Sequence, residues 1–185
     1  HDALPILKEH WDLYAPIVDD YKQLIDQHTD RDVFGLNCGD IFWDTPATFF
    51  PPYIDKAKKL DIPIYRAIGN HDIDCNGATH ETSYRTFEGY FGPTHYSFNK
   101  GNAHYIVINN NFYVGREYFY IGYVDETTFK WLEEDLSYVP KGTLVFFMTH
   151  IPTRITEQKR PFNYDYGMLA GETINAESEI GRAHV

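Results

Sequence analysis

The chain has 185 residues, of which 43% are hydrophobic and 23% are charged, and this composition is typical of one globular domain. Its net charge of −11 argues against a protein that binds the backbone of nucleic acids, although bound cations can still attract an anionic substrate. No apolar run approaches the ~18 residues of a membrane span, and two cysteines cannot form a disulfide framework.

The first third of the chain predicts two helices, each followed by a short apolar strand. A break in the first helix is expected near Pro16, and the second helix is expected to begin near Pro51-Pro52, because proline is tolerated in a first helical turn. Cys38 is expected to be a small buried residue at the end of the first strand. In chain order we expect helix Leu4–His28, strand Asp32–Cys38, helix Thr48–Leu60 and strand Ile62–Ile68.

The rest of the chain predicts a mixture of helices and strands. Asp125 has the position of an N-cap, and Gly92-Pro93 forms a stop signal for the helix before it. The segment Asn109–Tyr123 is rich in Tyr, Phe and Gly and is either a loop or an irregular hairpin. In chain order we expect helix Thr79–Phe91, a hairpin of Tyr96–Phe98 with His104–Ile108, a helix from Asp125 to Ser137 and strand Thr143–Met148.

Polar side chains follow three of these strands at the point where each strand ends. The first strand runs into Gly39-Asp40, the second into Gly69-Asn70-His71-Asp72, and the last into Thr149-His150. Alone, Asp40 and Asn70 would be ordinary turn residues, and His150 would be a hydrogen-bonded core histidine. Three in succession, separated by helical patterns, favour a βαβ sheet with one shared site. Gly69 is expected to leave its strand through a conformation that a Cβ would hinder.

A carboxylate, an amide oxygen and an imidazole suit first-row divalent ions such as Mn, Fe, Zn, Co or Ni. The two carboxylate oxygens of Asp40 could bridge two ions, and such a pair clamps a phosphoryl group and activates water. Asn70 and His150 would then be ligands of one of the two ions.

His71 cannot easily bind the same ion as its neighbour Asn70, because successive side chains diverge. It is better placed to touch the substrate as a general acid or as a stabiliser of developing charge. Asp72 could accept a hydrogen bond from His71 and fix its ring, and Asp44 could orient the loop of Asp40.

At these residues the sequence resembles the calcineurin-like metallophosphoesterases. The family's GD motif with a second aspartate is present as Gly39–Asp44 (GDIFWD), GNHD as Gly69–Asp72, and the later strand-end histidine as His150. The resemblance covers residues 1 to 178 and implies an α/β fold, a double β-sheet sandwich flanked by helices in four layers. It implies a dinuclear metal site in which Asp40 bridges, Asn70 and His150 bind one ion, and His71 is the acid.

Two family motifs are not complete in this chain. Of the opening D-x-H only His1 could remain, which makes His1 a further candidate metal ligand, and the late G-H-x-H is absent. We therefore expect residues 1–178 to be a partial phosphoesterase domain, inactive alone, and the fold to be incomplete. We expect residues 179–185 to be encoded by a sequencing adapter. The resemblance is to a bacterial multidomain branch, which implies flanking domains and an exported or periplasmic protein.

Two classes of function follow from these residues. The first is hydrolysis of a phosphomonoester or phosphodiester, with a small-molecule phosphate ester as substrate and no nucleic acid as partner. The second is a non-catalytic scaffold on the same fold that binds proteins. The presence of Asp40, Asn70, His71 and His150 together favours the enzyme, because a scaffold has no chemical need for this set.

Overall fold

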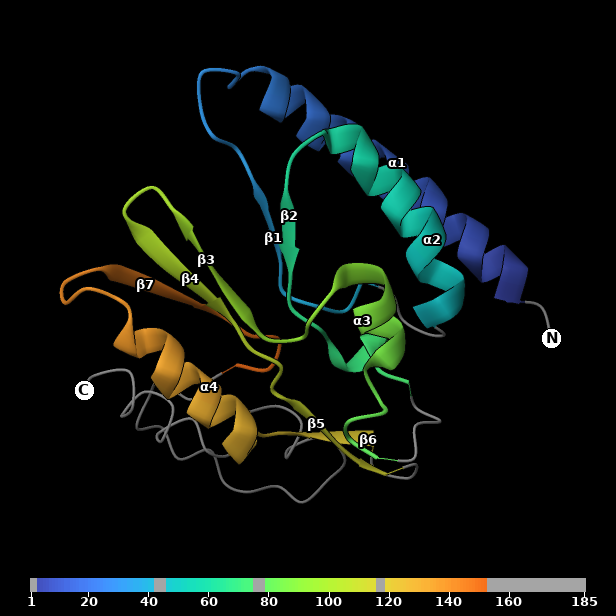
Figure 1. The fold of residues 1–185 in the computed structure, drawn as a ribbon. Helices are drawn as coiled ribbons and strands as arrows, with labels where there is room; N and C mark the ends of the chain where they lie inside the picture. Colours follow the sequence, from blue (N-terminus) through green and yellow to red (C-terminus); the bar gives the residue numbers. More distant parts are fainter. Residues whose placement is uncertain (1–2, 42–45, 75–78, 116–118, 153–185) are drawn as a thin grey trace, which may run out of the picture. The chain divides into compact units, whose positions relative to one another are not determined.

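The computed structural model describes residues 3–41, 46–74, 79–115 and 119–152 (Figure 1). The predictions for His1, for Asp44 and for residues 179–185 lie outside these ranges. The chain divides into two compact units, the first formed by residues 1–37 and 47–65 and the second by residues 38–46 and 66–185.

The first unit pairs two helical segments with a two-stranded sheet. Strands β1 and β2 are hydrogen-bonded neighbours, and the amide of Gly35 donates to the carbonyl of Pro63 at 2.8 Å. Helices α1 and α2 run side by side (Figure 1). The rings of Tyr14 from α1 and Tyr53 from α2 lie 6.0 Å apart between them. Its elements are α1 (Ala3–Asp26), β1 (Gly35–Asn37), α2 (Pro46–Ala57), the 3-10 helix η1 (Lys58–Leu60) and β2 (Ile64–Arg66).

Both proline predictions for this unit are wrong. Helix α1 continues through Pro16 without a break, and the loss of one backbone donor is offset by packing of the helix, in which Val18 is buried. Helix α2 begins at Pro46, so Pro51 and Pro52 lie inside it. Pro46 has the residue type favoured in a first turn, and the buried Phe50 and Tyr53 hold the segment that follows.

The second unit contains a three-stranded sheet in the order β3-β4-β7 (Figure 1). Strands β3 (Tyr96–Lys100) and β4 (Ala103–Val107) form the predicted hairpin, and β7 (Leu144–Met148) pairs with β4 in parallel. The prediction that the three site-bearing strands share one sheet is therefore wrong. Apolar runs identify strands, but pairing depends on packing between distant segments, and β7 finds its partner in β4 rather than in β2.

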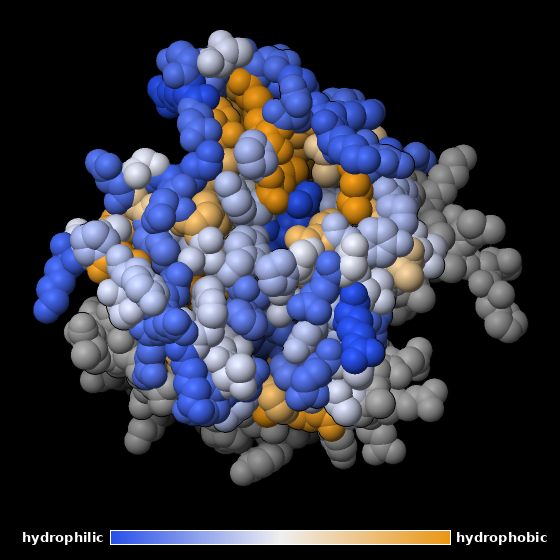
Figure 2. Space-filling view, viewed as in Figure 1, coloured by the Kyte–Doolittle hydropathy of each residue, from blue (hydrophilic) through white to orange (hydrophobic). Residues whose placement is uncertain are grey.

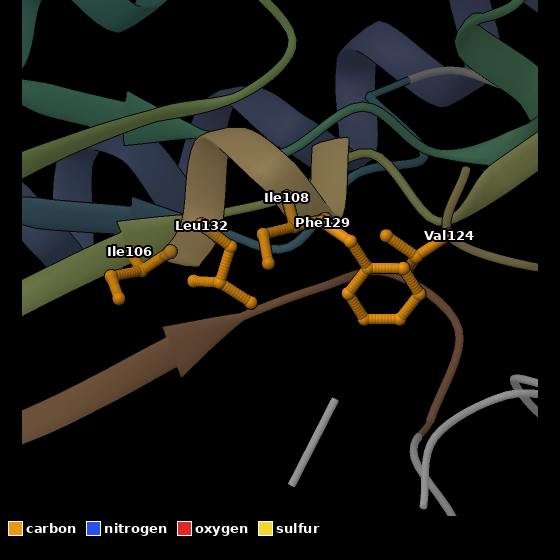
Figure 3. Close-up of a cluster of buried hydrophobic side chains, with 5 residues drawn as sticks. All are labelled: Ile106, Ile108, Val124, Phe129 and Leu132. Atoms are coloured by element: carbon orange, nitrogen blue, oxygen red, sulfur yellow. The ribbon is translucent and has the colours of Figure 1, made fainter. Parts of the chain in front are cut away.

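Helix α4 (Glu126–Ser137) covers one face of this sheet. Asp125 is its N-cap, as predicted, and accepts the amide of Thr128 at 2.8 Å. Figure 3 shows the core between helix and sheet, where apolar side chains of α4 meet those of β4 and its extension. The buried members of this core are Ile106, Ile108, Val124, Phe129 and Leu132.

Two further elements of the second unit differ in extent from their predictions. Helix α3 (Arg85–Phe91) begins six residues later than expected. The hydroxyl of Thr82 donates to the carbonyl of Thr79 and accepts its amide, and such local bonds compete with a helix. The irregular segment after β4 is a hairpin of β5 (Asn111–Gly115) and β6 (Phe119–Gly122) with a register shift between Tyr113 and Gly115.

The polarity of the surface agrees with the share of charged residues in the sequence. The face drawn in Figure 2 is mostly hydrophilic, as expected for a chain with 23% charged residues. None of the described helices is long and apolar enough to cross a bilayer.

Candidate functional site

The structure brings Asp40, Asn70 and His150 together. Nε2 of His150 lies 2.9 Å from Oδ1 of Asn70 and 3.4 Å from Oδ1 of Asp40. Asp40 follows β1, Asn70 begins the 3-10 helix η2 (Asn70–Asp72) after β2, and His150 follows β7. All three residues belong to the second unit. Their predicted convergence is therefore a feature of the fold, and their role as metal ligands stays a prediction.

The ring of His150 is oriented by its other nitrogen. Nδ1 lies 2.8 Å from the backbone carbonyl of Cys38, to which it can only donate. This bond directs Nε2 toward the two side-chain oxygens, and a histidine that ligates a metal is usually fixed in this way. Nε2 and the oxygens of Asn70 and Asp40 all carry lone pairs, so the three atoms fit a first-row divalent ion.

The turn that carries Asp40 has an uncommon backbone conformation. Gly39 has a φ of +96° and Asp40 a φ of +54°, both in the left-handed region. Aspartate tolerates this region better than most residues, and such strain concentrates at functional sites. A Cβ on Gly39 would lie 2.6 Å from the amide nitrogen of Gly69, so this position also needs glycine for space.

Gly69 is needed for space alone. Its φ of −99° is ordinary extended backbone, so the prediction of a special conformation there is wrong. A Cβ on Gly69 would lie 2.1 Å from the backbone nitrogen of Asp40 and 2.3 Å from its Oδ1. The two glycine turns pack directly on each other, and this close approach brings Asp40 next to Asn70.

The carboxylate of Asp72 joins the same two turns. It is completely buried, and its oxygens accept the amide of Gly69 at 2.8 Å and the amide of Ile41 at 2.9 Å. Burial raises the pKa of Asp72 to about 6, and the two amide bonds oppose this rise. Asp72 is therefore a brace between the turns. Its predicted role in orienting His71 stays a prediction.

His71 is half-buried, and its backbone amide donates to Oδ1 of Asp40 at 3.1 Å. This bond holds the carboxylate of Asp40 toward His150. The role of the His71 ring as a general acid stays a prediction. Cys38 is exposed, so its prediction as a buried residue is wrong: β1 ends at Asn37, and the carbonyl of Cys38 bonds to the ring of His150.

Sequence reasoning missed three residues around the site. Asn110 and Asn111 are completely buried and bond to the loops of His150 and Asn70. Burial, and then the negative charge of Asp40, raise the pKa of Tyr120, so this phenol lies in the field of the site. Consecutive asparagines directly after an apolar strand were a signal for the first two, since polar residues at strand ends often build sites.

The sequence of this chain matches the model of a known protein family. The sequence model described as calcineurin-like phosphoesterase matches residues 9–177, which include Asp40, Asn70–Asp72 and His150. The chain belongs to this family. Its fold is that of a metallophosphoesterase domain, α/β with several sheets, consistent with an incomplete sandwich, so the predicted family and fold class are confirmed. A comparison with curated proteins found no match.

Membership of the calcineurin-like phosphoesterases connects the site to hydrolysis of phosphoesters and to divalent metals, which this family generally uses. Among the described residues, no group of three or more His, Cys, Asp and Glu side chains is placed to hold a metal ion. The candidate site brings together two such side chains, Asp40 and His150, and the side-chain amide of Asn70.

Proposed function

We propose that this phosphoesterase domain hydrolyses a phosphomonoester or phosphodiester of a small molecule at a site for two divalent ions. The observation that carries the proposal is the approach of Nε2 of His150 to the side-chain oxygens of Asn70 and Asp40. A hydrogen bond from Nδ1 to the Cys38 carbonyl fixes the ring in this direction. An arrangement of lone pairs with a fixed histidine has a clear use in binding a cation.

The residues have distinct roles in this proposal. Two divalent ions held at the site would polarise the phosphoryl group and supply an activated water. Asp40 has a second carboxylate oxygen and is the ligand that both ions share. Asn70 contributes a neutral oxygen and His150 a ring nitrogen to one ion, and this ligand set is compatible with Mn, Fe, Zn, Co or Ni.

His71 donates a proton to the leaving oxygen in this scheme. Its backbone amide donates to Oδ1 of Asp40. This bond fixes the backbone of His71 relative to the proposed metal ligands. Asp72 keeps the turns of Asp40 and Asn70 together through its two amide bonds. The proton transfer is thus built on a rigid support, as general acid catalysis requires.

The test measures metal binding and turnover in the complete gene product. Manganese affinity is measured for the wild type, for His150→Ala and for His95→Ala, a control histidine whose ring packs on Trp131 at 5.0 Å. Nitrophenyl phosphate monoesters and diesters are the substrates. We expect His150→Ala alone to lose metal and turnover.

Two results would contradict the proposal. Equal metal content in the His150→Ala variant and the wild type would remove His150 from the site. A wild-type protein that binds no divalent ion and hydrolyses neither ester would instead favour the protein-binding scaffold on the same fold.

A further inference from the structure

The side chain of Asn110 is completely buried and pairs with the backbone of Ile151, the residue that follows His150. Its Nδ2 donates to the carbonyl of Ile151 at 2.6 Å, and its Oδ1 accepts the amide of Ile151 at 3.1 Å. An amide that is bound at both ends cannot rotate without breaking both bonds. The loop after β7 is therefore held at a point directly next to His150.

The neighbouring Asn111 holds the other loop of the site. Its Nδ2 donates to the carbonyl of Ile68 at 2.7 Å, and Ile68 lies two positions before Asn70. Its own amide donates to Oδ1 of Asn109 at 2.9 Å, which fixes the chain between the asparagines. The side chain of Asn111 is completely buried, so water does not compete for these bonds.

From these contacts we infer that Asn110 and Asn111 are positioning residues that set the distance between Asn70 and His150. Consecutive α-carbons are about 3.8 Å apart across a trans peptide, so two adjacent side chains tie the two loops to one short piece of backbone. They act through the backbone of Ile68 and Ile151 rather than on the predicted ligands themselves. The functional part of this inference rests on the proposed metal site, whereas its structural part does not.

The presence of asparagine at position 111 is not explained by its contribution to stability. Its Oδ1 is buried and has no hydrogen-bond partner among the described residues, and an unpaired buried acceptor destabilises a fold. A leucine of similar size would avoid this penalty. The bond from Nδ2 to the carbonyl of Ile68 is the gain that the asparagine brings. Asn111→Leu therefore removes the connection to the Asn70 loop while it also removes the unpaired oxygen.

The experiment compares two variants of the pair with a core variant in the complete gene product. The variants are Asn110→Asp and Asn111→Leu, and the control is Leu132→Ala, which opens a cavity in the core beneath α4 but removes no hydrogen bond of the asparagine pair. The first measurement is the NMR signal of the His150 ring nitrogens without added metal. We expect the signal to move in both variants of the pair and to stay in place in the control.

The second measurement is the affinity for Mn(II). We expect each variant of the pair to bind about 10–100-fold more weakly, as is usual when partners outside the ligand set are removed. The control should stay within about threefold of the wild type, because it keeps the hydrogen bonds from the asparagine pair to Ile68 and Ile151.

Asn110→Asp also provides a rescue by pH. An ionised carboxylate can accept the amide of Ile151 but cannot donate to its carbonyl, whereas a protonated carboxyl group can do both. The ratio of the Mn(II) affinity of this variant to that of the wild type should therefore rise toward one as the pH is lowered. Asn111→Leu, which has no ionisable side chain at its position, should show no such recovery.

The inference is overturned if the His150 signal is unchanged in both variants, or if Leu132→Ala moves it as much as they do. A wild type that binds no Mn(II) is a different result. It contradicts the proposed function, while the comparison of the His150 signals still decides whether the asparagine pair positions the ring.

Discussion

The side-chain oxygen of Asn70 lies 2.9 Å from Nε2 of His150, although the two residues are eighty positions apart in the chain. One belongs to η2 and the other to the loop after β7, so neither local sequence nor a single element can bring them together. The contact exists only when both loops are in place. It is therefore a direct measure of whether the site is assembled.

The predicted ligands Asp40 and Asn70 should differ in how many ions they hold. In the complete gene product, Asp40→Asn should weaken the binding of both divalent ions, because an amide carries no charge and bridges poorly. Asn70→Ala should weaken mainly one. Metal analysis after desalting checks this, and the same full occupancy in both variants as in the wild type would refute the assignments.

His71→Ala should keep its metals and lose turnover. The expected loss is about 10²–10⁴-fold, the usual contribution of a general acid. It should shrink for substrates with good leaving groups such as nitrophenyl esters, because these need less protonation. Turnover of a matched series of esters measures this dependence. A variant that loses its metals would show that His71 is a ligand instead.

Local patterns predicted much of this fold. The N-cap Asp125 marks the start of α4, and turn residues after Lys100 mark the hairpin, because both signals act between residues close in sequence. The same holds for the site, since Asp40, Asn70 and His150 each follow an apolar strand.

Long-range relationships could not be predicted in the same way. The pairing of β7 with β4 depends on which distant surfaces pack together, and no period in the sequence encodes it. The requirement for Gly69 is likewise set by a neighbour 29 positions earlier, whose backbone nitrogen would meet a Cβ at 2.1 Å. Glycine at a strand end indicates a special position but does not say whether conformation or space is the reason.

Gly69→Ala tests this close approach. The added methyl group would meet the backbone of Asp40, so the two turns must separate, and we expect a loss of about 1–3 kcal/mol in the free energy of unfolding. Metal binding should weaken in parallel. Chemical denaturation and Mn(II) titration measure the two effects.

Gly89→Ala is the matched control for this substitution. Gly89 lies inside α3, and a Cβ there would meet no atom within 4 Å. Alanine favours a helix over glycine by about 0.5–1 kcal/mol, so this variant should be slightly more stable than the wild type. A Gly69→Ala variant as stable as Gly89→Ala would contradict the packing of the two turns.

The last prediction concerns acid stability and the pair of His80 and Asp125. Nδ1 of His80 accepts the amide of Tyr113, so the proton of the neutral ring lies on Nε2, which is 3.7 Å from Oδ2 of Asp125. The neighbouring His80, and to a smaller extent the amide of Thr128, lower the pKa of Asp125 from 3.8 to about 2, although burial opposes this. The unfolded chain therefore takes up a proton at a higher pH than the folded chain does.

The sign of the effect follows from this difference. The contribution of Asp125 is fully present above about pH 4 and is lost as the pH falls toward about 2, because the unfolded state binds more protons in this window. Its size is at most about 2.5 kcal/mol, from ~1.4 kcal/mol per pKa unit, and solvent screening of the partly exposed carboxylate reduces it. Asp125→Asn keeps a good N-cap but removes the charge, so it should be less stable than the wild type at neutral pH and should approach the stability of the wild type as the pH falls through about 2. Asp125→Ala should lose about 1 kcal/mol more at every pH, since it also removes the cap.

Urea unfolding across this pH range measures the stability of all three proteins. A stability deficit of Asp125→Asn that persists unchanged at low pH would contradict the charge interaction.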